Sequence, residues 1–284
     1  MPRLARAEPR LSPGWNSLTL RILSALVLAP IAIAAAWFGW PFLPILTGVA
    51  GAVMAWEWAR LCSGGAVGQC GQTVIGFVLS AVIVAAFFSV PVGIALIAIG
   101  AAVIWAVGRS GTEAQLVHEP GWLAAGVWWI GLPCVLLLWL ARPEESGRAT
   151  LLWMFAVVWA TDIGAYAIGR WIGGPRLAPR WSPGKTWAGL IGGAGCAALV
   201  GWGTARLLGA SSVLPLVLLS AALAIVGQFG DLAESVAKRR FGVKDSSGLI
   251  PGHGGLLDRL DGLLAVIPTV ALLSLICGSV LTWR

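Results

Sequence analysis

Long apolar stretches make up most of the chain. A transmembrane helix needs about 20 predominantly apolar residues, with a range of about 17 to 25. Nine stretches of that length are present, at 22–39, 42–59, 73–89, 91–108, 122–141, 149–168, 188–207, 213–229 and 263–281. Inside lipid the backbone polar groups must bond to one another, so such stretches fold as helices. The sequence therefore predicts an all-α integral membrane protein, a polytopic bundle of about nine transmembrane helices.

Composition supports this fold class. The chain is 58% hydrophobic and 11% charged, whereas soluble domains carry about 25% charged residues. Two local alternatives stay open. Only residues 89–91 separate the third and fourth stretches, which form either a tight turn or a re-entrant pair. Basic residues precede the first stretch, which is predicted as an uncleaved helix; cleavage as a signal peptide near 34–36 is the alternative.

The Lys and Arg residues are distributed unevenly between the two sides of the predicted bundle. With the N-terminus inside, 15 of the 19 lie on the cytoplasmic side, and the four outside are Arg142, Arg148, Arg206 and Arg284. Cytoplasmic loops of membrane proteins carry such an excess. This predicts a basic cytoplasmic arm at 1–21 and a single transmembrane catalytic domain at 22–284. The polar loops 169–187 and 230–262 then face the cytoplasm, from a bacterial-type inner (plasma) membrane.

Charge and cysteines exclude several other classes of protein. The formal net charge of +7 is assigned to loops that orient the protein in an anionic membrane, and no nucleic-acid partner is predicted. The five cysteines are scattered without a CxxC pair or a Cys/His cluster. Neither a zinc site nor a disulfide framework is predicted.

The polar segment 231–240 follows the eighth stretch. If the helix continues past Gly230, Asp231, Ser235 and Lys238 share one face. Glu234 can then pair with Lys238 at i, i+4 spacing. A carboxylate beside a hydroxyl and a cation suits a metal–phosphate site; ordinary charges at a helix end are the alternative.

Glycines and aspartates mark the next segment, 248–261. The glycines around His253 let backbone N–H groups approach an anion, and His253 either contacts phosphate or caps the loop. Asp258 and Asp261 lie three residues apart on one predicted helix face. Oxygen ligands on this spacing suit Mg²⁺, which takes one or two carboxylates plus substrate phosphate. Alternatively, Asp258 pairs with Arg259 or is a helix N-terminal charge.

A third polar region spans 161–189. Asp162 lies inside an apolar stretch, where an ionisable residue is a functional candidate; pairing with Arg170 is the alternative. The run 182–186, SPGKT, opens the seventh helix. A helix N-terminus with a lysine and two hydroxyls can cradle phosphate, although the spacing is not that of a Walker A loop; an ordinary basic loop is the alternative. Glu57 is either a helix-end charge or a cavity wall.

Together these segments resemble the phosphatidate cytidylyltransferase (CDP-diacylglycerol synthase) family. Its hallmark is Ser, two residues, Lys-Arg, four residues, Lys-Asp, then His-Gly-Gly and Asp-Arg-x-Asp. The matching residues are Ser235, Lys238, Arg239, Lys244, Asp245, Ser247, Pro251, His253, Gly254, Gly255, Asp258, Arg259 and Asp261. The segments TDIGAY and SPGKT and the setting of Glu57 are also similar. Two positions depart from the family: Ala237 replaces a larger aliphatic residue, and Ala188 stands where Glu is common.

The resemblance implies an enzyme that joins CTP and phosphatidic acid with Mg²⁺, and a second cation as an option. The implied metal ligands are Asp231, Asp258 and Asp261. The other implied catalytic residues are Lys238, Arg239, Lys244, Asp245, His253 and Arg259. The implied substrate-binding residues are Asp162, Ser182, Lys185, Thr186 and Ser235.

Three rival functions differ from this family in what they require of the sequence. A CTP-dependent polyprenol kinase needs a base for its alcohol acceptor. A CDP-alcohol phosphotransferase needs a DGxxAR run, which is missing. An anion transporter predicts charges spread through the middle of the membrane, whereas here they cluster at one face. Finally, the glycine-rich face 189–203 allows helix association, so a homodimer is an open prediction.

Overall fold

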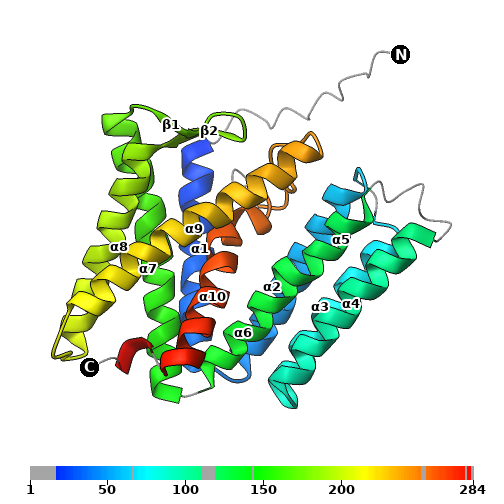
Figure 1. The fold of residues 1–284 in the computed structure, drawn as a ribbon, viewed down its shortest axis with the longest axis horizontal. Coiled ribbons are helices and arrows are strands. Elements are labelled where there is room, and N and C mark those ends of the chain that lie inside the picture. The colour runs from blue at the N-terminus through cyan, green and yellow to red at the C-terminus, as the bar shows by residue number, and fades with distance from the viewer. Residues whose placement is uncertain are drawn as a thin grey trace.

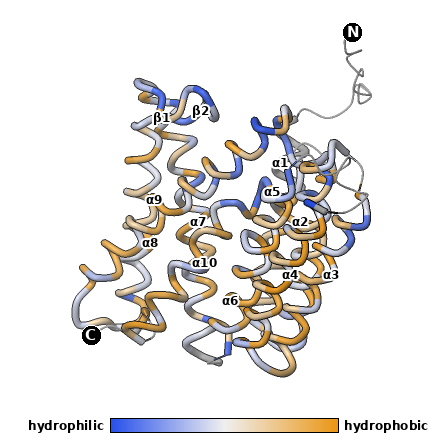
Figure 2. The backbone as a smooth tube through the Cα atoms, turned by 45° about the vertical axis from the view of Figure 1, so that its right-hand side comes forward, coloured by the Kyte–Doolittle hydropathy of each residue, from blue (hydrophilic) through white to orange (hydrophobic). Residues whose placement is uncertain are grey.

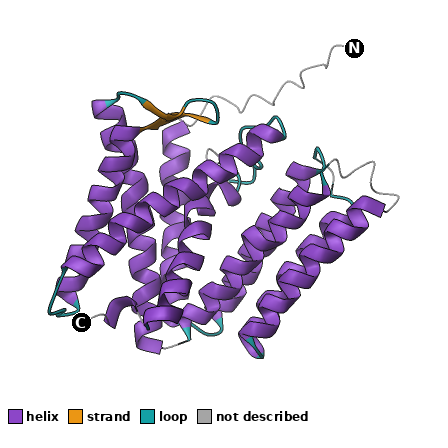
Figure 3. Cartoon of the chain, viewed as in Figure 1, coloured by secondary structure: helices purple, strands orange, loops and turns teal. Residues whose placement is uncertain are grey.

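The computed structural model describes residues 17–65, 67–110, 119–142, 144–250, 254–278 and 280–282. Within these residues the fold is almost entirely helical (Figures 1 and 3). The α-helices are α1 Ser17–Phe38, α2 Phe42–Cys62, α3 Gln69–Phe87, α4 Val90–Ser110, α5 Pro120–Gly126, α6 Leu132–Ala141, α7 Glu144–Ile172, α8 Trp187–Leu207, α9 Leu214–Arg240 and α10 Leu257–Cys277. Strands β1 Arg176–Ala178 and β2 Ser182–Thr186 form one antiparallel hairpin.

Eight helical segments in the described part of the chain are long and apolar enough to cross a membrane, and α1 adds the shorter apolar run Leu26–Phe38. A π-helical turn, Val127–Gly131, joins α5 to α6, so that Pro120–Ala141 forms one span. The predicted bundle of about nine transmembrane helices is confirmed. Helix α1 already includes residues 17–21, the end of the predicted basic arm; residues 1–16 lie outside the described residues.

Helices α3 and α4 settle one of the open alternatives. Each is a separate helix of spanning length, and only Phe88 and Ser89 lie between them. The two helices pack against each other along their length (Figure 1). The tight turn is therefore confirmed, and the re-entrant pair is not.

Three helices differ from the predicted spans at the ends that carry the polar segments. Helix α7 continues to Ile172, α9 continues to Arg240, and α10 begins at Leu257. In the extra turns of α9 and α10, Lys238 pairs with Asp258 across the two helices, so these helices do not stop where the apolar runs stop. The hydrophilic residues gather mostly at the end of the bundle that carries β1 and β2 (Figure 2).

Glycines let α8 lie close against α7. A Cβ atom on Gly192 would be 2.6 Å from Ile168, and one on Gly193 would be 2.9 Å from the carbonyl oxygen of Thr161. This part of the glycine-rich face 189–203 is therefore used for packing inside the chain, as is common between membrane helices. The homodimer stays a prediction.

Candidate active site

A buried ion pair joins α9 to α10. The Nζ atom of Lys238 lies 2.6 Å from Oδ1 of Asp258 and 3.2 Å from Oε1 of Glu234. The side chain of Asp258 is 4% exposed, that of Glu234 is fully buried, and that of Lys238 is 11% exposed. The predicted pairing of Glu234 with Lys238 is confirmed. A single ammonium group therefore lies between two carboxyl groups.

Asp258 also organises the loop before α10. Its Oδ2 atom accepts hydrogen bonds from the backbone N–H of Ser246 at 2.9 Å, from the Ser246 hydroxyl at 2.8 Å and from the N–H of Gly255 at 2.8 Å. Asp258 lies in the first turn of α10, where a carboxylate interacts favourably with the helix dipole. The interpretation of Asp258 as a helix N-terminal charge is therefore confirmed, in addition to its pairing with Lys238.

Glu57 anchors the same loop from α2. Its Oε1 atom accepts from the Ser247 hydroxyl at 2.6 Å and from the N–H of Leu256 at 2.9 Å, and its Oε2 atom accepts from the N–H of Leu257 at 2.7 Å. Glu57 is 0% exposed. It therefore satisfies two donors at the start of α10, a role that the sequence did not reveal. The available signal was an acidic residue between two tryptophans in an apolar stretch.

The glycines of this loop are required by close contacts. A Cβ atom on Gly255 would be 2.0 Å from Oγ of Ser246 and 2.5 Å from Oε1 of Glu57. Gly254 has a φ of +84°, a conformation that other residues rarely adopt. The N–H of Gly255 already binds Asp258, so the anion that it approaches belongs to the protein. Pro251, Gly252 and His253 lie outside the described residues, and the role of His253 stays a prediction.

A second charged cluster lies between β2 and α9. The Nζ atom of Lys185 lies 2.7 Å from Oδ2 of Asp231 and donates to the carbonyl oxygen of Gln228 at 3.1 Å. The Ser235 hydroxyl donates to Oδ1 of Asp231 at 3.4 Å, one helical turn away on the predicted face. The Asp231 side chain is 34% exposed. This carboxylate is therefore oriented by its neighbours and remains accessible.

Asp162 and Asp261 complete the acidic surroundings of Asp231. Asp162 on α7 interacts electrostatically with Asp231, Lys185 and Arg259. Asp261 on α10 interacts electrostatically with Asp231, Glu234 and Asp162. Asp162 therefore belongs to this cluster; no ion pair with Arg170 is present among the described residues. Three helices contribute carboxylates to one site.

The β1–β2 hairpin places the SPGKT segment. The Thr186 hydroxyl caps α8 by accepting from the N–H of Gly189 at 3.0 Å. The hairpin is tied to α9 because Nε of Arg239 donates to the carbonyl oxygen of Trp181 at 3.3 Å. Ser182 and Lys185 are thereby held on a strand, although we expected them at a helix start. The N–H of Gly189, at the start of α8, is thus bonded to Thr186 and is not available to a phosphate.

The remaining predicted residues lie at the exposed rim. Lys244, Asp245 and Arg259 are exposed. Lys244 and Asp245 make no ion pair within the described part of the chain. Hydrogen bonds to Asp258 and Glu57 hold the loop that Lys244 and Asp245 occupy. The side chains of Lys244 and Asp245 are therefore free to contact a ligand.

The carboxylate oxygens at this site can be compared with what the predicted Mg²⁺ requires. No group of three or more His, Cys, Asp or Glu side chains in the described ranges could hold a metal ion by itself. Mg²⁺ usually takes one or two carboxylates and leaves its other positions to water and substrate phosphate. Asp231 and Asp261 fit that pattern. Asp258 does not fit in this arrangement, because Oδ2 already accepts from three donors and Oδ1 pairs with Nζ of Lys238 at 2.6 Å.

Comparison with known proteins agrees with the geometry. Residues 19–277 match the cytidylyltransferase family. The chain is 40% identical over 256 residues to a phosphatidate cytidylyltransferase of Brucella suis. The aligned residues cover 88% of this chain and 90% of the relative. It is 36% identical over 267 residues to a phosphatidate cytidylyltransferase of Pseudomonas aeruginosa, and the aligned residues cover 89% of this chain and 95% of that relative. The resemblance seen in the polar segments is confirmed, and the chain belongs to the cytidylyltransferase family.

Proposed function

We propose that this protein is a phosphatidate cytidylyltransferase of phospholipid biosynthesis. It joins CTP and phosphatidic acid to give CDP-diacylglycerol and pyrophosphate, with Mg²⁺. The observation that carries the proposal is the pair of charged clusters, Lys185–Asp231 and Lys238–Asp258, at one end of an apolar bundle. The names of relatives 36–40% identical over most of the chain supply the substrates.

The chemistry of this reaction suits a site without a strong base. An oxygen of the phosphatidic acid phosphate attacks the α-phosphorus of CTP, the α–β phosphoanhydride bond breaks, and pyrophosphate leaves. The attacking phosphate is already ionised near neutral pH, so no proton has to be removed. The enzyme must instead hold two anions in line and neutralise their charge. Mg²⁺ held by Asp231 and Asp261 would supply positive charge to the phosphates of CTP and to the leaving pyrophosphate.

Each cluster has a distinct role in this proposal. Lys185, oriented by Asp231, binds the phosphates of the nucleotide, and Ser182 and Thr186 lie on the same strand. Lys238 of α9 is held by Asp258 at the start of α10, and its ammonium group neutralises phosphate charge.

The rim supplies further charge. Arg239, Lys244 and Arg259 are exposed cations near the same end of the bundle, available to phosphate. Asp231 and Asp261 would hold Mg²⁺, and Oδ1 of Asp258 would join them only in exchange for its contact with Lys238. Asp162 orients Lys185, and Ser235 orients Asp231.

The proposed site faces the cytoplasm of a bacterial-type inner membrane. The charge count of the sequence supports this orientation, since 15 of the 19 Lys and Arg residues lie in the segments assigned to the inside. CTP would then enter from the cytoplasm, and phosphatidic acid would enter sideways from the bilayer.

The test is pyrophosphate release by the purified protein in detergent. Release should require CTP, phosphatidic acid and Mg²⁺ together, and the lipid product should be CDP-diacylglycerol. Asp258→Asn should abolish turnover while the protein still folds. Release of CDP with a polyprenol, and none with phosphatidic acid, would identify a lipid kinase instead. Binding of CTP without turnover on any lipid would point to transport.

A further inference from the structure

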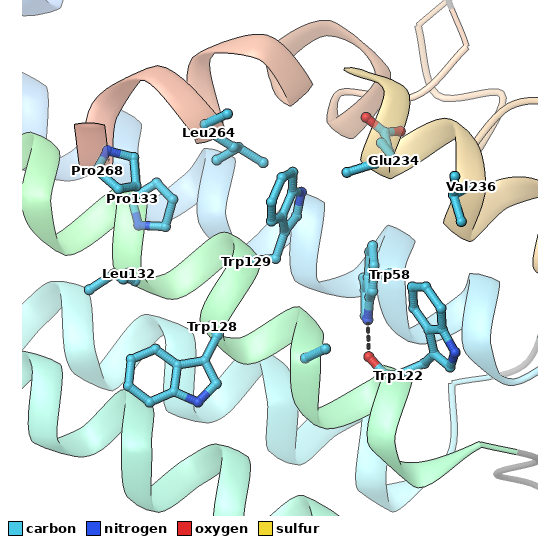
Figure 4. Close-up of a pocket in the computed structure, with 13 residues that line it drawn as sticks. Trp58, Trp122, Trp128, Trp129, Leu132, Pro133, Glu234, Val236, Leu264 and Pro268 are labelled. Atoms are coloured by element: carbon cyan, nitrogen blue, oxygen red, sulfur yellow. Dashed lines mark hydrogen bonds between the residues drawn. The ribbon is translucent and has the colours of Figure 1, made fainter. Parts of the chain in front are cut away.

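An apolar cavity of about 720 Å³ lies beside the charged site, between α5–α6 on one side and α9–α10 on the other. Its wall includes Trp58, Trp122, Trp128 and Trp129, and Pro133 and Pro268 lie at its far end (Figure 4). Small-molecule pockets occupy roughly 300–1,000 Å³. All of these residues belong to membrane-spanning segments, so the cavity lies at membrane depth.

Glu234 joins the wall of the cavity to the proposed active site. Glu234 lines the cavity, and its Oε1 atom lies 3.2 Å from Nζ of Lys238, which holds Asp258. Asp258 and Pro268 are ten residues apart on α10. At 1.5 Å per residue the cavity therefore reaches about 15 Å below the ion pair. That is about half of a hydrocarbon core roughly 30 Å thick, the depth of one leaflet.

The polar atoms in the cavity wall are shielded from the open space. Nε1 of Trp129 and both carboxylate oxygens of Glu234 are buried and make no hydrogen bond in the structure, although Oε1 of Glu234 lies 3.2 Å from Nζ of Lys238. Nε1 of Trp58, in the same wall, donates to the carbonyl oxygen of Trp122 at 2.8 Å (Figure 4). The cavity therefore offers a ligand almost only apolar surface, which suits a hydrocarbon chain.

We propose that this cavity binds an acyl chain of the lipid substrate, with the phosphate on the side of Glu234 and Lys238. The inference rests on the proposed function. A phospholipid from the facing leaflet matches the depth, the apolar wall and the position of the cavity next to the ion pair. The bound acyl chain would thus hold the phosphate in line for attack. The tryptophans of the cavity would determine which acyl chains fit.

A filling variant tests the cavity. Ala125 lines it and is exposed, whereas Ala102 on α4 is exposed and does not line it. Ala125→Leu should raise the KM for dioleoyl phosphatidic acid by roughly 10-fold or more, as small changes in an apolar pocket do. The KM for CTP and the melting temperature should stay unchanged, and Ala102→Leu should change none of these values. An unchanged lipid KM, or equal rises in both KM values, would overturn the inference.

Photolabelling provides a readout that does not need turnover. Wild-type protein in nanodiscs receives phosphatidic acid with a diazirine at the end of one acyl chain. Peptides that contain Leu132 or Pro268 should be labelled, and unlabelled phosphatidic acid should compete. Equal labelling by phosphatidylcholine with the same chain, or labelling confined to α3 and α4, would mean that the cavity binds no substrate chain.

The two failures are distinguishable. Competed labelling in a protein that never forms CDP-diacylglycerol would refute the proposed function and keep a phosphatidic acid site. Formation of CDP-diacylglycerol without competed labelling would keep the function and refute the acyl-chain site.

Discussion

Replacing Glu57 with glutamine removes one charge from a fully buried side chain without changing its size. The carboxylate accepts three hydrogen bonds, from the Ser247 hydroxyl and from the N–H groups of Leu256 and Leu257. A glutamine has a single acceptor oxygen, and its NH₂ group can only donate. If the oxygen faces Ser247 and Leu256, the NH₂ group meets the N–H of Leu257, and two donors face each other.

The magnitude follows from these bonds. A hydrogen bond to a charged group contributes about 1.5–3 kcal/mol, and a buried donor left unsatisfied costs about 1–3 kcal/mol. Glu57→Gln should therefore destabilise the protein by about 2–5 kcal/mol. Because Leu257 precedes Asp258, the start of α10 should move, and a displacement of about 1 Å can cost 10²-fold in rate. We expect pyrophosphate release to fall by about that factor.

The assay is thermal unfolding in one detergent, followed by pyrophosphate release under saturating CTP. Glu119→Gln is the matched control, because Glu119 pairs with Arg240 at the exposed end of α9, where such pairs stabilise little. The control should unfold at the wild-type temperature and retain activity. If Glu57→Gln matched the control in both measurements, the anchoring role of Glu57 would be refuted.

Three further variants probe the site. Gly255→Ala should unfold at a lower temperature and lose activity, because a Cβ atom there would be 2.0 Å from Oγ of Ser246, whereas Gly248→Ala meets nothing within 4 Å and should melt and turn over like wild type. Asp258→Asn should still fold but melt at a lower temperature, because it weakens a buried ion pair and three hydrogen bonds, and it should lose turnover by about 10² or more, as removal of a positioned electrostatic group does; retained pyrophosphate release would contradict its role. Lys185→Met should raise the KM for CTP and leave the KM for phosphatidic acid unchanged; the reverse pattern would place Lys185 on the lipid.

The helices were predictable because lipid leaves the backbone few options. Apolar runs of spanning length became helices, and the turn at Ser89 was one of two stated alternatives. The helix ends were less accurate. Residues such as Lys238 and Asp258 extend α9 and α10 past the apolar runs by pairing across helices, which a hydropathy pattern does not contain.

The site residues were partly predictable from spacing within one segment. The pair Glu234–Lys238 and the contact between Ser235 and Asp231 are local, at one helical turn. The anchoring by Glu57 joins residues about 200 positions apart, and only the fold brings them together. The β1–β2 hairpin was missed because Pro183 and Gly184 are unusual in a strand.

The central claim is that cytidylyl transfer, and not phosphate transfer, occurs at this site. The direct measurement is incubation of the purified protein with phosphatidic acid, Mg²⁺ and CTP radiolabelled at either its α- or its γ-phosphorus, followed by lipid extraction. The proposed reaction predicts that the α-label enters the lipid as CDP-diacylglycerol, while the γ-label leaves as pyrophosphate. Recovery of the γ-label in the lipid fraction, with none from the α-position, would contradict it.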